Sequence, residues 1–394
     1  MDLFTQELLS RISAERLCDL TLELVRIPSP TGDSLEVTEH YTETIRALGL
    51  PVEVLRDCPH SPSTVARYGH RPNVPTLSLD GHLDTIHAPH PAPYVEGGRI
   101  YGRGSGDMKS GIAAMVEAMR VLVGSGVELG GNLILATHSL HEMPIGHMEG
   151  LKALIARGDV FVDAALVAEV GFDEIYIRGK GQALFEIEVT REGDVLHENV
   201  ARIRSLPNPL DYAARLASRI VQRGEELAAD EEPLLGPETF FLGQIQGGDF
   251  YNRVPTRAYL NGTYRCWPDK DWADIDREFN TLLESIPRDP RLQLDLKVYG
   301  NGLGWDLSPE TRIVQALRGA YQTVVGRELA LAGAHTVCDV NVIVREAGIP
   351  AVSHGTGTTT AHADLEWVEL DDVVRTTRVF LATIINYLGV ERAA

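Results

Sequence analysis

The stretch TLSLDGHLD, residues 76–84, places a short apolar run directly before Asp80, His82 and Asp84. Thr76 to Leu79 has the length and composition of a buried strand. In an open parallel sheet, ligands bind beyond the carboxyl ends of the strands. The polar side chains that follow this run are therefore candidates for a functional site.

Short apolar runs alternate with helical periodicity on both sides of this stretch. Strands are expected at 76–79, 132–136, 164–168 and 349–352, and helices at about 34–48, 111–123, 150–157, 311–325 and 371–387. Such alternation is typical of an α/β fold with a mixed, mostly parallel sheet flanked by helices.

The pattern changes between residues 179 and 302. Phe185, Ile187 and Val189 alternate as in a half-buried strand, and the elements that follow complete the order β-α-β-β-α-β. This is the ferredoxin-like α+β arrangement, whose antiparallel sheet can leave one face free. We therefore expect a larger unit formed by 1–178 and 303–394, with a smaller unit, 179–302, inserted into it.

Composition excludes several classes of protein. A chain of 394 residues exceeds the roughly 250–300 at which one core stops growing, which agrees with two units. The net charge of −20 disfavours nucleic acid and anionic membranes as partners. The four cysteines are scattered and never form a CxxC pair, and no signal peptide is evident. We expect a cytoplasmic protein.

Further candidate donors follow the other expected strands. Glu142 comes after the run ending at Ala136, Glu169 comes after Ala168, and His362 follows the run 349–352. Asp107 precedes an expected helix, where a carboxylate is also an ordinary helix cap. Taken singly, each of these residues is more often a turn, cap or surface residue than a ligand. Their joint placement beside glycine-rich turns is what favours a site.

Imidazole nitrogens and carboxylate oxygens without sulfur suit zinc, and a carboxylate that bridges makes a two-metal centre feasible. Asp84, two residues after His82, is placed to accept the second N–H of that histidine. His138 is expected to be a hydrogen-bonded structural histidine, and His87 and His90 are expected to be loop residues.

At these residues the sequence resembles the dinuclear zinc amidohydrolases that include aminoacylase, acetylornithine deacetylase, succinyl-diaminopimelate desuccinylase and bacterial glutamate carboxypeptidase. The resemblance runs nearly end to end, and its motifs are Leu24 to Gly32, Gly81 to Asp84, Tyr101 to Gly111, Ala168-Glu169 and Ala361-His362. It implies a zinc-exopeptidase-like catalytic domain with two divalent metal ions. Zinc is the first expectation, with manganese or cobalt as alternatives.

The resemblance also implies a role for each donor. Asp107 would bridge the two metals, His82 and Glu169 would hold one, and Glu142 and His362 would hold the other. Asp84 would orient His82.

In the inserted unit, the resemblance implies a lid or dimerisation domain and a homodimer. His197, Asn252 and Arg265 match segments that contact the polar groups of the substrate. His197 corresponds to a histidine that reaches the site of a neighbouring subunit. Arg265 would hold a carboxylate through its planar guanidinium.

One position departs from the family. Two adjacent glutamates are expected where this chain has His141-Glu142, so a histidine stands in place of the general base. His141 could itself be the base, since imidazole titrates near neutral pH. It could instead bind substrate while metal-activated water needs little help, or hydrolysis could have been lost or changed. A less favoured alternative makes Glu142 the base and Glu149 a ligand.

The leading hypothesis is a two-metal hydrolase that cleaves an amide bond of a small carboxylate-bearing substrate, an N-acyl amino acid or dipeptide-like compound. A second hypothesis is an aminohydrolase, or deaminase, acting on an amino-substituted unsaturated or aromatic acid. A third is a non-catalytic metal-containing binding protein.

Overall fold

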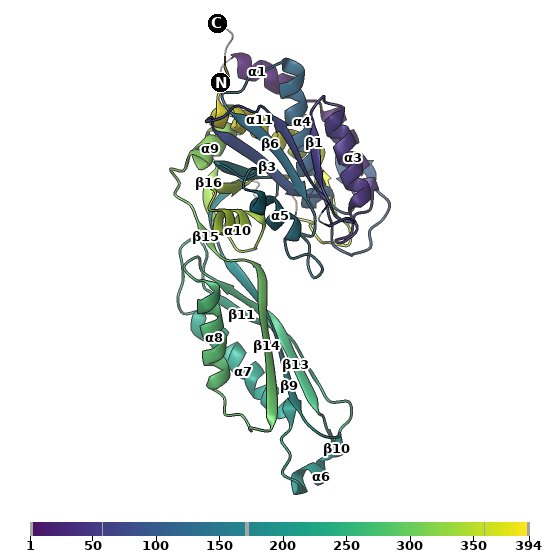
Figure 1. The fold of residues 1–394 in the computed structure, drawn as a ribbon, viewed down its shortest axis with the longest axis vertical. Coiled ribbons are helices and arrows are strands. Elements are labelled where there is room, and N and C mark those ends of the chain that lie inside the picture. Colours follow the sequence, from purple (N-terminus) through teal and green to yellow (C-terminus); the bar gives the residue numbers. More distant parts are fainter. Residues whose placement is uncertain (1–2, 57, 170–172, 358, 392–394) are drawn as a thin grey trace. The chain divides into compact units, whose positions relative to one another are not determined.

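A computed structural model describes residues 3–56, 58–169, 173–357 and 359–391. The chain divides into two compact units (Figure 1). The first comprises Met1–Ile177, Leu307–Ala332 and Cys338–Ala394, and the second comprises Arg178–Asp306 and Gly333–Val337. The second unit is thus inserted into the first.

The first unit is built on a six-stranded sheet in the order β1-β2-β6-β3-β7-β17. Its strands are β1 (Val52–Leu55), β2 (Ser63–Tyr68), β3 (Thr76–His82), β6 (Asn132–His138), β7 (Ala164–Val167) and β17 (Ala351–Ser353). The last four in spatial order, β6, β3, β7 and β17, are parallel, whereas β1 and β2 pair antiparallel at one edge. The predicted mixed, mostly parallel sheet is confirmed.

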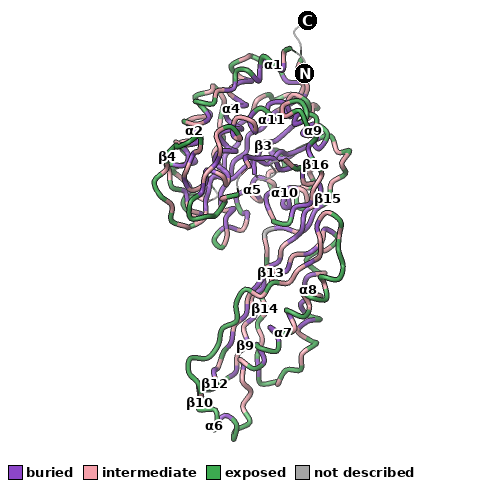
Figure 2. Tube along the Cα trace, turned by 180° about the vertical axis from the view of Figure 1, so that it is seen from behind, coloured by how far each residue is buried: buried purple, intermediate pink, exposed green. Residues whose placement is uncertain are grey.

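Helices cover this sheet and explain why β3 is buried along its whole length. They are α1 (Leu3–Ser10), α2 (Ala14–Arg26), α3 (Leu35–Arg46), α4 (Ser110–Ser125), α5 (Glu149–Arg157), α9 (Arg312–Val325), α10 (Asp339–Val342) and α11 (Leu370–Leu388). α4 and α11 pack on β3, while α3 and α5 pack on β2. Figure 2 shows the buried residues gathered around β3.

Alternation along β3 separates apolar from polar side chains. Leu77 and Leu79 share one face, whereas Ser78, Asp80 and His82 share the other, because successive residues of a strand point to opposite faces. All five are fully buried. The polar face of β3 therefore runs through the interior toward the carboxyl edge of the sheet.

A small three-stranded sheet joins distant parts of the first unit. It consists of β4 (Tyr94–Glu96), β5 (Arg99–Tyr101) and β18 (Trp367–Glu369), in the order β18-β5-β4. The pairing of Trp367 with Tyr101 brings the segment before Asp107 beside the segment after His362. The two paired strands are thus far apart in the sequence.

The second unit carries a four-stranded antiparallel sheet in the order β11-β13-β9-β14. Its elements are β9 (Gly181–Arg191), β10 (Leu196–His197), α6 (Glu198–Ile203), α7 (Pro209–Leu227), β11 (Thr239–Gly247), β12 (Arg253–Val254), β13 (Arg257–Cys266), α8 (Trp272–Glu284) and β14 (Leu292–Gly302). Phe185, Tyr212 and Phe279 lie in the core between the sheet and α7 and α8. The order of strands is the one expected for a ferredoxin-like unit.

The remaining strands, β8 (Glu174–Gly179), β15 (Trp305–Asp306) and β16 (Ala330–Ala334), form a separate small sheet. Among the helices of the described residues, none has both the length and the apolar character needed to cross a membrane.

Candidate metal centre

The carboxyl ends of the parallel strands deliver most of the candidate donors to one edge of the sheet. β3 ends at His82, β7 ends shortly before Glu169, and β6 ends shortly before His141 and Glu142. The segment with His362 follows β17. Since these strands are parallel, their ends meet at the same edge.

The carboxylate of Asp107 faces a different histidine with each of its oxygens. Oδ1 lies 3.2 Å from Nε2 of His82, and Oδ2 lies 3.3 Å from Nε2 of His362. Glu142 lies on the same side of the Asp107 carboxylate as His362, because its Oε1 lies 2.9 Å from Nε2 of His362. This is the arrangement in which one carboxylate could bridge two cations.

Glu169 lies on the other side of the Asp107 carboxylate, with His82. One ligand atom from each of His82, His141 and Glu169 lies within 4.8 Å of the others. Glu169 is buried, and its Oε2 has no hydrogen-bond partner among the described residues. Burial raises the pKa of this carboxyl to about 8. A buried carboxylate oxygen without a partner is costly unless a cation or proton compensates it, so the residues fit a metal pair.

The electrostatics of the cluster favour positive charge. Burial alone lowers the pKa of His82, but its hydrogen bond to Asp107 and the charges of Asp107, Asp84 and Glu169 raise it well above its ordinary value. Hydrogen bonds to Asp107 and Glu142 raise the pKa of His362 to about 10. The carboxylates that hold protons on these imidazoles would also attract divalent cations.

His141 lies inside the cluster. Its ring stacks on that of His82 with a centroid separation of 4.0 Å and an interplanar angle of 9°. Its Nδ1 lies 2.9 Å from Oδ1 of Asp339, a hydrogen bond that leaves Nε2 as the nitrogen available for other chemistry. The sequence did not indicate Asp339, which is the first residue of the short helix α10.

Asp84 acts differently from the expectation that its carboxylate orients His82. Nδ1 of His82 pairs at 2.9 Å with the backbone carbonyl of Asp84, whereas Oδ1 of Asp84 lies 3.8 Å away. Oδ2 of Asp84 accepts hydrogen bonds from the backbone N–H groups of His141 and Glu142, each at 3.0 Å. That expectation was wrong in this detail: the carboxylate anchors the loop that carries His141 and Glu142.

Glu366, a second residue that the sequence pattern did not indicate, fixes the turn that carries Asp107. It accepts hydrogen bonds from the backbone N–H groups of Gly104, Gly106 and Asp107 at 3.0, 2.9 and 3.0 Å. Arg103 donates to the same carboxylate at 2.9 Å. The residues around Glu366 in the sequence do not indicate this role. The role depends on the pairing of β5 with β18, which brings Glu366 beside the turn.

The histidines assigned to loops and to structure behave as expected. Nε2 of His87 lies 2.8 Å from the carbonyl of Thr31, and Nε2 of His90 accepts from the N–H of Glu366 at 2.8 Å. His138 is buried and pairs with Asp339 at 3.1 Å. Glu149 is exposed and accepts from the N–H of His147, so the structure does not bring it to the cluster.

The three expected substrate-binding residues lie in the second unit, but not together. The side-chain amide of Asn252 lies 3.0 Å from Nε2 of His197, beside β10 and α6 (Figure 1). Arg265 lies at the far end of β13 and donates to the carbonyl of His335 at 2.9 Å. A strand rises about 3.4 Å per residue, which separates Arg257 from Arg265 by ~27 Å. One chain therefore does not unite His197 and Asn252 with Arg265.

Comparison with known proteins supplies a family. A model of the peptidase family M20/M25/M40 matches residues 78–386. A probable succinyl-diaminopimelate desuccinylase from Staphylococcus aureus is 23% identical over 321 residues, covering 73% of this chain and 76% of that protein. An N-formyl-4-amino-5-aminomethyl-2-methylpyrimidine deformylase from Halalkalibacterium halodurans is 24% identical over an alignment of 430 positions, covering 98% of each chain.

A solved structure shares the fold. The M20 family metallo-carboxypeptidase Sso-CP2 from Sulfolobus solfataricus matches with a TM-score of 0.78 at 20% identity, over 94% of this chain and 98% of that chain. The resemblance drawn from the sequence motifs and the expected class of enzyme are both confirmed. The chain belongs to peptidase family M20/M25/M40, a family of metal-dependent hydrolases that act on carbon–nitrogen bonds.

Proposed function

We propose that the protein uses two divalent cations to hydrolyse an amide bond in a small molecule that bears a carboxylate, such as an N-acyl amino acid or a dipeptide. The observation that carries this proposal is the Asp107 carboxylate, whose two oxygens face His82 and His362 at 3.2 and 3.3 Å. Relatives named as a desuccinylase and a deformylase support an N-acyl substrate.

Each cation has its own set of residues. His82 and Glu169 would hold one, Glu142 and His362 would hold the other, and Asp107 would bridge them. Zinc suits these nitrogen and oxygen donors, with manganese or cobalt as substitutes. When bound, such a pair supplies a Lewis acid for the amide carbonyl and lowers the pKa of water.

His141 is the proposed proton carrier. The hydrogen bond of its Nδ1 to Asp339 holds the tautomer whose Nε2 can accept a proton. Nε2 takes the proton of the attacking water and later delivers it to the nitrogen of the leaving amine. A neutral imidazole in place of a glutamate makes the site one unit more positive, which favours an anionic substrate.

Arg265 is the proposed partner of the substrate carboxylate. Its guanidinium uses one Nη1 bond to the carbonyl of His335 and retains further N–H donors in a planar fork. His197 and Asn252, hydrogen-bonded to each other near β10, would contact substrate from a second subunit, because they lie at the opposite end of β13.

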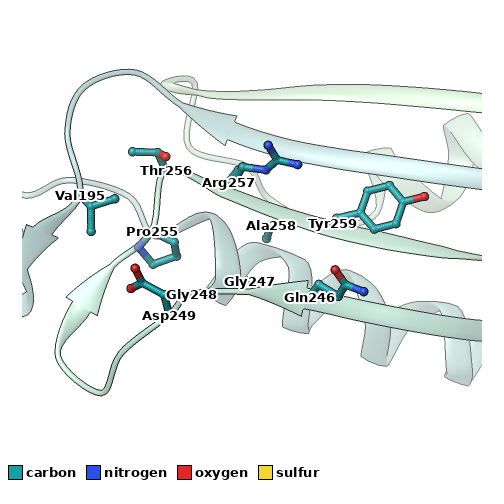
Figure 3. A pocket seen from close by; sticks show the side chains of 10 residues that line it. All are labelled: Val195, Gln246, Gly247, Gly248, Asp249, Pro255, Thr256, Arg257, Ala258 and Tyr259. Carbon is teal, nitrogen blue, oxygen red and sulfur yellow. The ribbon is translucent and has the colours of Figure 1, made fainter.

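We extend the proposal to a homodimer through the second unit, because Arg265 and the pair His197 and Asn252 lie at opposite ends of β13. β11 is an edge strand of the four-stranded sheet, and Phe241 and Ile245 on it are 64% and 44% exposed. An open pocket of about 350 Å³ lies beside this strand, lined by Gln246 and Tyr259 among others (Figure 3). Unpaired strand edges with apolar side chains favour pairing with another chain, here a second copy.

The net charge of −20 supports a small-molecule substrate rather than nucleic acid or a membrane surface, and we extend the proposal to a cytoplasmic enzyme.

The test is a hydrolysis screen of the purified full-length protein with added zinc, manganese or cobalt. Release of free amine from N-acyl amino acids or dipeptides is the expected result, and Asp107→Ala serves as the inactive control. Ammonia release from amino-substituted unsaturated or aromatic acids, with no amide cleavage, would instead establish the aminohydrolase reaction.

A further inference from the structure

A second group of buried polar side chains lies behind His141. Asp80 on β3, His138 at the end of β6 and Asp339 at the start of α10 are all fully buried. We refer to these three residues as the Asp80 cluster. The proposed reaction assigns no role to Asp80 or His138.

The donors of the Asp80 cluster converge. Nε2 of His138 lies 3.1 Å from Oδ2 of Asp339 and 3.6 Å from Oδ2 of Asp80. One ligand atom of each residue lies within 4.8 Å of the other two. Zinc bonds of about 2.0 Å at tetrahedral angles place neighbouring donors ~3.3 Å apart. The spacing thus resembles that around Asp107, where the corresponding separations are 3.2 and 3.3 Å.

Hydrogen bonding within the Asp80 cluster leaves one of its two carboxylates without a hydrogen bond. Nε2 of His138 can carry only one proton, yet a carboxylate oxygen lies on each side of it. Both oxygens of Asp80 are buried and have no hydrogen-bond partner among the described residues. Two buried carboxylates that share one N–H repel each other, and an unpaired buried charge is costly.

The remaining contact of the cluster fixes its orientation. Oδ1 of Asp339 is taken by Nδ1 of His141 at 2.9 Å, which leaves Oδ2 directed at His138. A divalent cation between Asp80, Asp339 and a neutral His138 would balance the two carboxylate charges without using any donor of the proposed metal pair.

We propose that the Asp80 cluster binds a third divalent cation of the zinc class, held by Nε2 of His138 and one oxygen each of Asp80 and Asp339. One imidazole and two carboxylates suit zinc better than calcium or magnesium, which prefer oxygen donors alone. Occupation of this site would also fix Asp339, and through it the imidazole of His141.

Metal content of the full-length protein tests this proposal. After loading with zinc and removal of excess metal, elemental analysis is expected to give about three zinc ions per chain, and about two for Asp80→Asn. Ser78→Ala is the matched control, because Ser78 lies on the same face of β3 and its hydroxyl bonds only the carbonyl of Val160 at 2.5 Å among the described residues. It should retain about three.

Two zinc ions in both the unaltered protein and Asp80→Asn would overturn the third site while leaving the proposed pair intact. If Asp80→Asn does not fold, His138→Gln is measured in the same way. Anomalous diffraction at the zinc edge from the unaltered protein is independent of any variant. A peak at the Asp80 cluster supports the proposal, and peaks confined to the residues around Asp107 contradict it.

Discussion

Asp339 holds His141 by a hydrogen bond of 2.9 Å between Oδ1 and Nδ1, and its second oxygen lies 3.1 Å from Nε2 of His138. Burial alone raises the pKa of Asp339, but the charges and hydrogen bonds of His138 and His141 lower it well below its ordinary value. Asp339 is therefore an anionic acceptor, and it fixes which nitrogen of His141 carries the proton.

Asp339→Asn should lower kcat by about 10² to 10⁴-fold, because the amide N–H can donate to Nδ1 and force the proton onto Nε2 of His141. KM should change little if substrate binds through other residues. Steady-state kinetics with a zinc measurement checks this. An unchanged kcat in a folded variant that keeps the two cations around Asp107 would show that Asp339 does not act through His141.

His141→Ala should reduce kcat by roughly 10²-fold or more, because no group then takes the proton of the attacking water. The two cations around Asp107 should remain, since the proposed ligands are intact. Turnover is measured beside metal content. Unchanged turnover excludes His141 as the proton carrier, and loss of a cation together with activity would make His141 a ligand.

Asp107→Ala should remove the two cations of the proposed pair together with activity, because it deletes the oxygen that faces each histidine. Elemental analysis and the amide-hydrolysis assay are the measurements, with circular dichroism as the check on folding. A variant that keeps both cations at full occupancy would contradict the bridging role.

Hybrid dimers test whether His197 serves a neighbouring subunit. His197→Ala and Asp107→Ala should each be inactive alone. A doubly tagged hybrid of the two should regain about half of the wild-type activity, because one of its two sites has both an intact cluster and an intact partner histidine. His70→Ala, a change at an exposed histidine of the first unit, is the control. An inactive hybrid places the role of His197 within its own chain.

Glu238 should make the stability of the second unit depend on pH. It is buried and accepts from the N–H of Trp267 at 2.8 Å and the hydroxyl of Tyr264 at 3.2 Å. Burial raises its pKa above the ordinary 4.5, so the folded state holds the proton more tightly than the unfolded state. Its stabilising contribution is complete below pH 4.5 and is lost as pH rises through the raised value.

Glu238→Gln stays uncharged at every pH and should remove this dependence. Denaturant unfolding from acidic to neutral pH measures the difference in unfolding free energy between wild type and variant. That difference should shift against the wild type as pH rises, and a constant difference would mean that Glu238 ionises equally in both states.

Local sequence determined the elements and their order. The spacing of apolar residues along the chain indicates a strand or a helix directly. It therefore predicted the strand before His82, the helices of the first unit and the β-α-β-β-α-β order of the second unit. The same patterns place His82, Glu142 and Glu169 at or just beyond strand ends, so the parallel sheet brings together donors that lie far apart in the chain.

The partners of those donors were decided only by the tertiary structure. Asp339 contacts His141, and Glu366 contacts the turn that carries Asp107, although each pair is far apart in the sequence. The residues next to Asp339 and Glu366 in the chain do not indicate these contacts. Asp84 shows the same limit: its spacing from His82 predicted a carboxylate contact, but the fold turned that carboxylate toward the loop at His141 and Glu142. Periodicity fixes which face a side chain occupies, whereas packing between distant segments selects the atom it meets.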